Sequence, residues 1–254
     1  MPELSVVIIT LNEERNIGRC IDSVREFADE IIVVDSLSTD RTEQICLEKG
    51  ARFIKNKFPG YIEQKNFAIS QASYPFILSL DADEAVSEEL KQSIMAAKAA
   101  PAFDGYTMNR LTSYCDKWIR HCGWYPDRKL RLWNSTMGKW GGMNPHDKYE
   151  MVPGARIGHL KGDLLHYSYY SINDHIIQVN KFSGIGAQAY FDRGKRAPML
   201  KIIFNPVITF IKDYFIRLGF LDGYYGFVIC VMSAHSKFLK YVKLRELYKQ
   251  KKSY

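Results

Sequence analysis

The sequence lacks the cysteine pairs that build disulfide frameworks or structural zinc sites. Its five cysteines are odd in number and form no CxxC pair, which indicates a reducing compartment. It also lacks a long uninterrupted apolar run: residues 218–234 come nearest, but Asp222 and several glycines interrupt them, which argues against a membrane span. No basic, apolar leader opens the chain, so we expect no signal peptide. The apolar content of 46% predicts a folded globular protein.

Basic residues are concentrated at the C-terminal end. From Arg193 onward the chain has 13 Lys/Arg and 3 Asp/Glu, whereas the preceding part has 22 basic and 25 acidic residues. Nucleic acid would be one partner for such a segment, but its aromatic and aliphatic content favours an anionic membrane surface instead. The alternative is a helical cap that packs on the rest of the chain and exposes its basic face to solvent.

The first hundred residues alternate between strands and helices. Apolar runs of strand length occupy residues 4–10, 30–36, 51–56 and 74–80. Asn12 is the expected N-cap of a first helix, which follows the first strand. Further helices are predicted over residues 38–50, 61–73 and 88–100, and Ser87 is the expected N-cap of the last. This order predicts an α/β fold with a mainly parallel sheet that helices cover on both faces.

The composition divides the chain into three parts. Residues 1–100 carry the strand–helix alternation, and residues 101–192 are rich in Trp, Tyr, Arg and Gly with short strand-like pieces. Residues 193–254 predict two or three helices. We therefore expect one α/β domain in two halves, 1–100 and 101–192, followed by a C-terminal helical extension.

Polar residues follow three of the predicted strands. Thr10–Glu13, Asp35–Ser36 and Asp81–Asp83 come directly after strands one, two and four. Since open α/β sheets bind their ligands at the carboxyl ends of the strands, these residues predict the position of the site.

Asp81 and Asp83 suggest a metal. Two residues apart on extended backbone, both carboxylates would project to the same side, where they repel each other unless a cation lies nearby. Mg²⁺ or Mn²⁺ commonly binds through one or two carboxylates and substrate phosphates, and would neutralise the charge on a departing diphosphate. The alternative is an acidic turn ahead of the helix that Ser87 caps.

The ordered motifs resemble a known family. "SVVIITLNEERNIGRCIDSV", "EIIVVDSLSTDRTEQI" and "FILSLDADE" are similar to the GT-A fold glycosyltransferases of family 2. "GWYPDRKLRLW" and "WGGMNPHDKYE" resemble the bacterial lipopolysaccharide-core β-1,4-glucosyltransferase subgroup. The resemblance covers most of residues 4–170. It implies a UDP-sugar donor, with glucose as the subgroup's sugar, and transfer with inversion to lipopolysaccharide core or another envelope glycan.

The resemblance also implies roles for individual residues. Those expected to bind the nucleotide-sugar are Thr10, Asn12, Glu13, Asp35, Gln64, Lys65, Asn66, Asp81, Ala82, Gly141 and Gly142. Asp83 would be the direct metal ligand, with Asp81 and a late histidine, His166, as further ligands. The catalytic base that takes the acceptor's proton would be Asp147, with Glu150 as the second choice.

Each assignment has a structural alternative. Thr10 and Asn12 could only cap a helix, Asp35 could only form a turn, and Lys65 could be a solvated helix charge. Asp147 could belong to a surface turn after Pro145, and an isolated histidine such as His166 is often structural. Arg128 and Arg131 could meet a diphosphate or an anionic acceptor, or could simply be solvated.

Two other functions compete with sugar transfer. A sugar-nucleotide nucleotidyltransferase would share the sheet and the acids, but it normally has a glycine-rich loop after the first strand, and "ITLNEERN" contains no glycine. A non-catalytic glycan- or nucleotide-binding module would not need Asp83 together with Asp147. The expected location is cytoplasmic and peripheral at the inner face of the cytoplasmic membrane, where the C-terminal helices would contact lipid.

Overall fold

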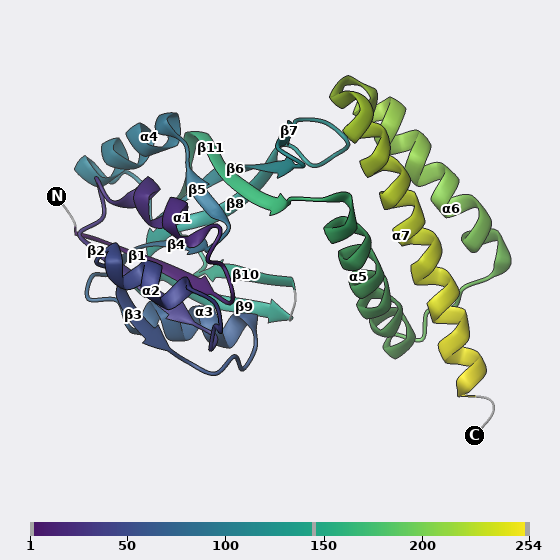
Figure 1. Ribbon diagram of the computed structural model, residues 1–254, viewed down its shortest axis with the longest axis horizontal. Coiled ribbons are helices and arrows are strands. Elements are labelled where there is room, and N and C mark those ends of the chain that lie inside the picture. The colour runs from purple at the N-terminus through teal and green to yellow at the C-terminus, as the bar shows by residue number, and fades with distance from the viewer. Residues whose placement is uncertain (1–2, 144–145, 252–254) are drawn as a thin grey trace. The chain divides into compact units, whose positions relative to one another are not determined.

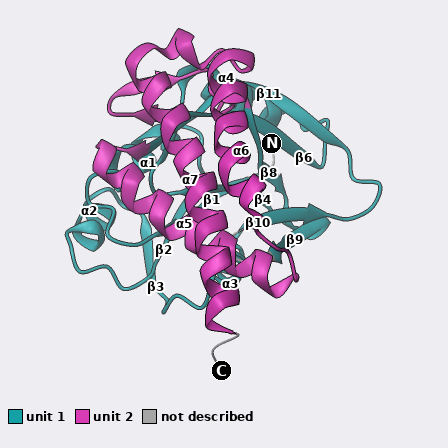
Figure 2. Ribbon diagram, turned by 90° about the vertical axis from the view of Figure 1, so that its right-hand side faces the viewer, with its two compact units in different colours: residues 1–111, 127–167 teal, residues 112–126, 168–254 magenta. Residues whose placement is uncertain are grey.

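The computed structural model describes residues 3–143 and 146–251 (Figure 1). It divides into two compact units (Figure 2): unit 1 is formed by residues 1–111 and 127–167, and unit 2 by residues 112–126 and 168–254. The division differs from the boundary expected at residue 193, because residues 112–126 and 168–192 belong with the C-terminal helices. Unit 1 combines residues from both expected halves of the α/β domain.

The first four strands of unit 1 are parallel, in the order β3-β2-β1-β4. They are β1 (Leu4–Thr10), β2 (Glu30–Asp35), β3 (Arg52–Lys55) and β4 (Phe76–Asp81). The helices that follow the first three are α1 (Ile17–Val24), α2 (Thr42–Glu48) and α3 (Tyr61–Ser70). The predicted α/β class is confirmed. The register pairs Thr10 with Asp35 and Ile9 with Asp81, so the three polar strand ends lie at one edge of the sheet.

The rest of the main sheet continues from β4 in the order β8-β6-β11-β5, with antiparallel pairs between β4 and β8, β6 and β8, and β5 and β11. These strands are β5 (Glu84–Val86), β6 (Gly105–Tyr114), β8 (Asp127–Asn134) and β11 (Ile157–Tyr169), and β7 (Lys117–Ile119) pairs with the end of β6. α4 (Glu88–Ala99) follows β5, and Ser87 caps it as predicted, accepting the Leu90 N–H at 3.3 Å. After the short η1 helix (Ser135–Met137), β9 (Gly138–Met143) and β10 (His146–Met151) form a separate antiparallel hairpin.

Apolar residues on both faces of β1 explain why helices cover the sheet on both sides. Val6 and Ile8 pack with Ile17 and Ile21 of α1 in one buried cluster, whereas Val7 belongs to a second cluster on the opposite face. Such burial on two faces is typical of parallel sheets.

The predicted N-cap of α1 is wrong. The helix begins at Ile17 with Asn16 as its N-cap residue, while Asn12 has a left-handed backbone with φ of +53°. The side chain of Asn12 instead accepts the N–H of Thr39, at 2.8 Å, and so joins the loop after β1 to the loop after β2.

Unit 2 is mainly helical, and the predicted C-terminal helical extension is confirmed. It contains α5 (Ile172–Asp192), α6 (Met199–Ile211), the π-helical turn η2 (Lys212–Ile216), η3 (Gly219–Asp222) and α7 (Gly223–Gln250). Both α5 and α6 pack along α7 (Figure 1). Among the described residues, no single helix has the length and apolar composition to cross a membrane; the pair 199–216 and 219–250, bent by 72°, meets those criteria only jointly.

Candidate active site

The acids at the end of β4 are held by cations from distant strands and helices. Asp81 lies 3.3 Å from Lys65 Nζ through Oδ1 and 2.7 Å from Arg131 Nη2 through Oδ2. The fully buried Glu84 lies 2.6 Å from the same Arg131 nitrogen through Oε1, and its Oε2 accepts the backbone N–H of Asp81. Burial alone would raise the pKa of Asp81, but Lys65 and Arg131 outweigh it and hold the pKa well below its usual range. Two of the three clustered acids are thus neutralised within the chain.

Asp83 has a separate partner. Residues 82–83 form a turn between β4 and β5, so the extended backbone expected to align Asp83 with Asp81 is wrong. The turn places Asp83 Oδ2 3.2 Å from Nε2 of His166 on β11. The structure therefore brings together Asp83 and His166, which were predicted as metal ligands from separate motifs.

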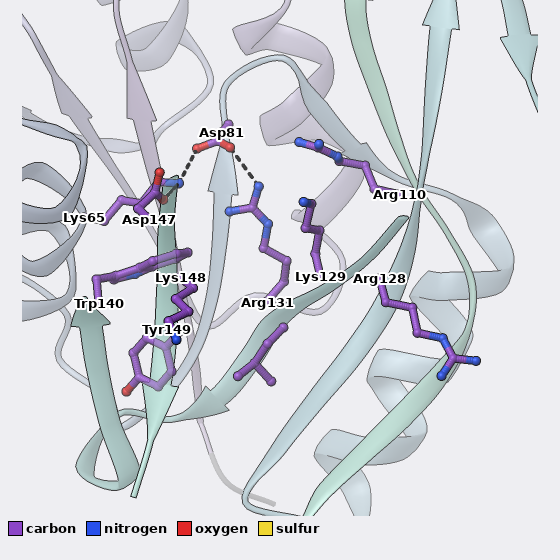
Figure 3. Close-up of a pocket in the computed structure, with 11 residues that line it drawn as sticks. Lys65, Asp81, Arg110, Arg128, Lys129, Arg131, Trp140, Asp147, Lys148 and Tyr149 are labelled. Atoms are coloured by element: carbon purple, nitrogen blue, oxygen red, sulfur yellow. Dashed lines mark hydrogen bonds and ion pairs between the residues drawn. The ribbon is translucent and has the colours of Figure 1, made fainter. Parts of the chain in front are cut away.

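Lys65 joins the candidate base to the strand-end acid. Its Nζ lies 2.8 Å from Asp147 Oδ2 on β10, in addition to its contact with Asp81, and 4.4 Å from the centre of the Trp140 ring. The Lys65 side chain is only 6% exposed, so the alternative of a solvated helix charge is wrong. One buried lysine from α3 thus holds the two carboxylates that the motifs single out, Asp81 and Asp147 (Figure 3).

These residues line a cavity of about 450 Å³ in unit 1 (Figure 3). Its charged lining consists of six basic and two acidic residues: Lys65, Arg110, Arg128, Lys129, Arg131, Lys148, Asp81 and Asp147. In Figure 3, Arg110 and Lys129 lie on the other side of Asp81 from Lys65, while Arg128 extends away from it. The excess of positive charge favours an anionic ligand such as a diphosphate.

Two of the residues predicted to contact the nucleotide, Thr10 at the end of β1 and Asp35 at the end of β2, are buried. The Thr10 hydroxyl oxygen has no hydrogen-bond partner among the described residues. Asp35 is 1% exposed and accepts both the N–H and the O–H of Ser38. Asp35 therefore makes the turn-forming contact that was its structural alternative.

Glu13 lies in the loop after β1, which the Asn12 side chain joins to the loop after β2. It accepts the side-chain N–H of Asn16 at 2.7 Å, while its own backbone N–H donates to the Thr42 hydroxyl at 2.9 Å. Burial raises the pKa of Glu13, and the neighbouring Asp83 adds to that effect. Glu13 is therefore close to the acid that we expect to bind metal.

The amides on either side of Lys65 serve to position it. Gln64 is fully buried and bonds to Asn56 at 2.7 Å and to the Ser36 hydroxyl at 3.1 Å. Asn66 bonds in both directions to the backbone of Trp140, each at 3.0 Å. Of the three residues predicted from "EQKNFA", only Lys65 lines the cavity.

Small residues shape the backbone near both acids. Ala82 is buried, and its N–H donates to Ile9 O at 3.2 Å. Gly142 pairs with Asp147 across the hairpin and has φ of +96°, which favours glycine. At Gly141 a Cβ atom would come 2.7 Å from Glu150 Oε2. Asn144 and Pro145 of the same motif lie outside the described residues.

The sequence revealed only part of the basic side of the cavity: Arg128 and Arg131 were candidates for contact with a diphosphate or an anionic acceptor, whereas Arg110 and Lys129 were not. Arg131 is 4% exposed and bridges Asp81 and Glu84, and Arg110 pairs with Asp127 at 2.8 Å, so neither is solvated. A signal was present in the alternation of Asp127, Lys129 and Arg131 along β8, since alternate residues of a strand share a face. The buried Glu84 gave no signal, because its counter-ion lies 47 residues away.

The predicted metal ligands are not all assembled. The described residues contain no group of three or more His, Cys, Asp or Glu side chains arranged to hold a metal ion. Asp81 contacts Lys65 and Arg131 in this arrangement, and its role as a metal ligand stays a prediction. Asp83 and His166 still offer one carboxylate and one imidazole side by side, and these would suit Mg²⁺ or Mn²⁺ if substrate phosphates supplied further oxygens.

Known proteins are similar to this chain over most of its length. Residues 5–152 match the family described as Glycosyl transferase family 2. An uncharacterized glycosyltransferase of Rickettsia typhi is 32% identical over 97% of this chain and 88% of its own length. The lipopolysaccharide core biosynthesis glycosyltransferase LpsC of Rhizobium meliloti is also 32% identical, over 95% of this chain and 91% of its own.

Solved structures are similar over shorter stretches. Glucosyl-3-phosphoglycerate synthase from Mycobacterium tuberculosis, in complex with Mn²⁺ and UDP-glucose, is 25% identical over 44% of each chain, with a TM-score of 0.38. S. aureus TarS is 17% identical over 71% of this chain and 39% of its own, with a TM-score of 0.48.

Proposed function

Because this chain belongs to glycosyltransferase family 2, we propose that it transfers a sugar from a UDP-sugar to an envelope glycan, with inversion at the anomeric carbon. Family membership makes it an enzyme of sugar transfer and decides against the nucleotidyltransferase and the non-catalytic module. Its similarity to LpsC supports lipopolysaccharide core as the acceptor. Glucose is proposed as the donor sugar because the sequence motifs resemble those of the glucosyltransferase subgroup.

The observation that carries this proposal is the contact of Lys65 with both Asp147 and Asp81 in one cationic cavity. Single displacement needs a base on the acceptor side and positive charge on the leaving-group side. In this arrangement Asp147 is the base and Lys65 lies between it and the strand-end acid.

The proposed step moves one proton and breaks one bond. The acceptor hydroxyl oxygen bonds to the anomeric carbon, the bond from that carbon to the diphosphate breaks, and the electron pair leaves with UDP. The hydroxyl proton passes to Asp147. Once protonated, Asp147 no longer neutralises Lys65, so the lysine charge becomes available to the diphosphate as negative charge develops there.

Asp83 and His166 would hold a divalent cation, and Mg²⁺ or Mn²⁺ bound there would neutralise charge on the departing diphosphate. Their contact at 3.2 Å supports this proposal. Asp81 would then contribute by fixing Lys65 and Arg131.

The basic side of the cavity supports an acceptor with negative groups. Arg110 and Lys129 are both held by Asp127, at 2.8 and 3.0 Å, on the opposite side of Asp81 from Lys65 (Figure 3). Arg110 also lies 3.6 Å from Glu84, which it shares with Arg131. The lining as a whole has six basic and two acidic residues, which leaves positive charge for a phosphate or carboxylate on the acceptor.

Asp147→Asn tests the proposed base. Loss of general-base catalysis is expected to reduce transfer by about 10²–10⁴-fold, measured as UDP released from UDP-glucose in the presence of lipopolysaccharide core. UDP should still raise the thermal midpoint of the variant, because a ligand that binds the folded state stabilises it.

The matched control is Glu150→Gln on the same strand. Glu150 is exposed and pairs with Lys148 at 3.2 Å, so its loss should leave transfer near the wild-type rate. Full activity in Asp147→Asn with loss in Glu150→Gln would make Glu150 the base. Retained configuration in the product, read by NMR of the anomeric proton, would contradict single displacement.

A further inference from the structure

The solvent-facing side of α6 is its apolar side. Leu200, Ile203, Phe204, Val207 and Ile208 are each between 52% and 68% exposed. Their spacing of three and four residues places them along one helical stripe. A helix that only covers a soluble core would show the reverse pattern, with such a stripe turned inward.

The exposed apolar surface continues past the end of α6. Through η2, η3 and the start of α7 it includes these further residues: Ile211, Phe215, Ile216, Leu218, Phe220, Leu221, Tyr224 and Phe227. Ile216 is 73% exposed and Tyr224 67%. Isolated apolar side chains on a surface are normal, but a contiguous patch of this kind marks a binding surface. We refer to the exposed apolar residues of 199–227 as the apolar face.

The acids of this segment point inward, each with a partner. Asp213 is 6% exposed and binds Arg217 at 2.9 Å. Asp222 is 4% exposed and accepts the N–H of His121 at 2.8 Å. Residues 199–227, all described, therefore show no acidic side chain on their surface.

The exposed lysines lie beside the stripe. Lys201 and Lys212 are both exposed and are separated by about three helical turns, so they follow the same edge of α6. Lysines at the edge of an apolar stripe extend their ammonium groups to lipid headgroups while the stripe enters the acyl boundary. A protein partner would not require that every surface charge on this face be positive.

We propose that the apolar face docks on an anionic phospholipid bilayer. This inference goes beyond the proposed function and does not depend on it, because it concerns helices outside the cavity. It refines the expected membrane contact by placing the docking residues on α6 and the turns after it. It is consistent with the expected location at the inner face of the cytoplasmic membrane.

Vesicle flotation of the full chain tests this docking. The protein should float with vesicles of phosphatidylglycerol and phosphatidylcholine, and Phe204→Asp with Ile208→Asp should reduce the bound fraction at least tenfold. The matched control is Leu47→Asp on α2, since Leu47 is 59% exposed and lies in unit 1; it should float like the wild type. Far-UV circular dichroism and thermal melting check that each variant is folded.

A second variant tests the charge. Lys201→Gln with Lys212→Gln should lose the preference for anionic over neutral vesicles and keep residual binding through the apolar residues. The proposal is overturned if the wild type fails to float, or if Phe204→Asp with Ile208→Asp floats equally well. A dimer that the same variant dissociates, without any vesicle binding, would assign the apolar face to a second copy of the chain. Flotation needs no donor and no turnover, so its failure would leave the proposed sugar transfer untouched.

Discussion

In unit 1 the charged side chains of Lys65, Glu84 and Arg131 are buried, whereas in unit 2 large apolar side chains of α6 remain in water. Both arrangements are unfavourable on their own, since burial penalises charge and water penalises apolar surface. In unit 1 each of these three buried charges has an opposite charge within the same unit. Within unit 2 these apolar side chains stay exposed, and the proposed bilayer would cover them. The first region balances its buried charges internally, and the second is the proposed binding surface.

The largest effect should follow from breaking the buried network. Arg131→Met removes the cation that Asp81 and Glu84 share, and leaves a fully buried Glu84 without its closest partner. Removing one member of a buried ion pair costs about 3–5 kcal/mol of unfolding free energy. Urea denaturation followed by tryptophan fluorescence measures this loss.

Arg128→Met is the control for this change, because Arg128 lies on the same strand but is exposed. Substitutions at such surface positions usually stay within about 0.5 kcal/mol. Equal stability of Arg131→Met and Arg128→Met would show that the buried network contributes nothing to the unfolding free energy. The buried charges of unit 1 would then not be stabilised by their partners, as the contrast with unit 2 assumes.

A smaller effect is expected from acid. The pKa of Asp81 is lower in the folded state than in the unfolded chain, so its contribution to stability is complete above the unfolded value, about 3.9, and declines as the pH falls below it. Between pH 7 and pH 3 this one group should therefore account for about 1 kcal/mol of lost stability.

Asp81→Asn should reduce the stability difference between pH 7 and pH 3 by about 1 kcal/mol. This holds however much the substitution itself lowers the unfolding free energy at pH 7. Asp22→Asn is the comparison, since Asp22 is 55% exposed and pairs only at the surface with Lys49. If both variants lose stability between the two pH values as steeply as the wild type, Asp81 is not held in its ionised form by Lys65 and Arg131.

The same contrast shows what the sequence could predict. The edge of the sheet where Thr10, Asp35 and Asp81 lie follows from strand order alone, and the motifs supplied Asp147. The contacts of Asp147 and Asp81 with Lys65 could not be predicted, because they join side chains that lie far apart in the sequence and meet only after the sheet and hairpin have formed. Local backbone was also misjudged: Asn12 adopts a left-handed conformation, and the turn at residues 82–83 separates Asp83 from Asp81.

For α6, the sequence predicted only that residues 193–254 form two or three helices, and not which side of each helix would be exposed. The buried side of α6 includes Ile202, whereas the larger number of apolar residues lies on the exposed side, so a polarity pattern would have chosen the wrong side as buried. Periodicity reports that a face exists, and only tertiary packing decides what covers it.

The smallest effect should come from that outer stripe. Ile202 and Ile203 are neighbours on α6, but Ile202 is 6% exposed and Ile203 52%. Ile203→Ala removes side-chain surface that water already reaches, so in aqueous buffer the unfolding free energy should change by no more than about 0.5 kcal/mol. Ile202→Ala, the same substitution one residue earlier, creates a cavity and should cost about 2–5 kcal/mol. Urea denaturation without lipid measures both. If Ile203→Ala proved as destabilising as Ile202→Ala, the outer stripe would be packed in solution, by a second copy or by the chain itself, and α6 would have no free apolar face to offer a bilayer.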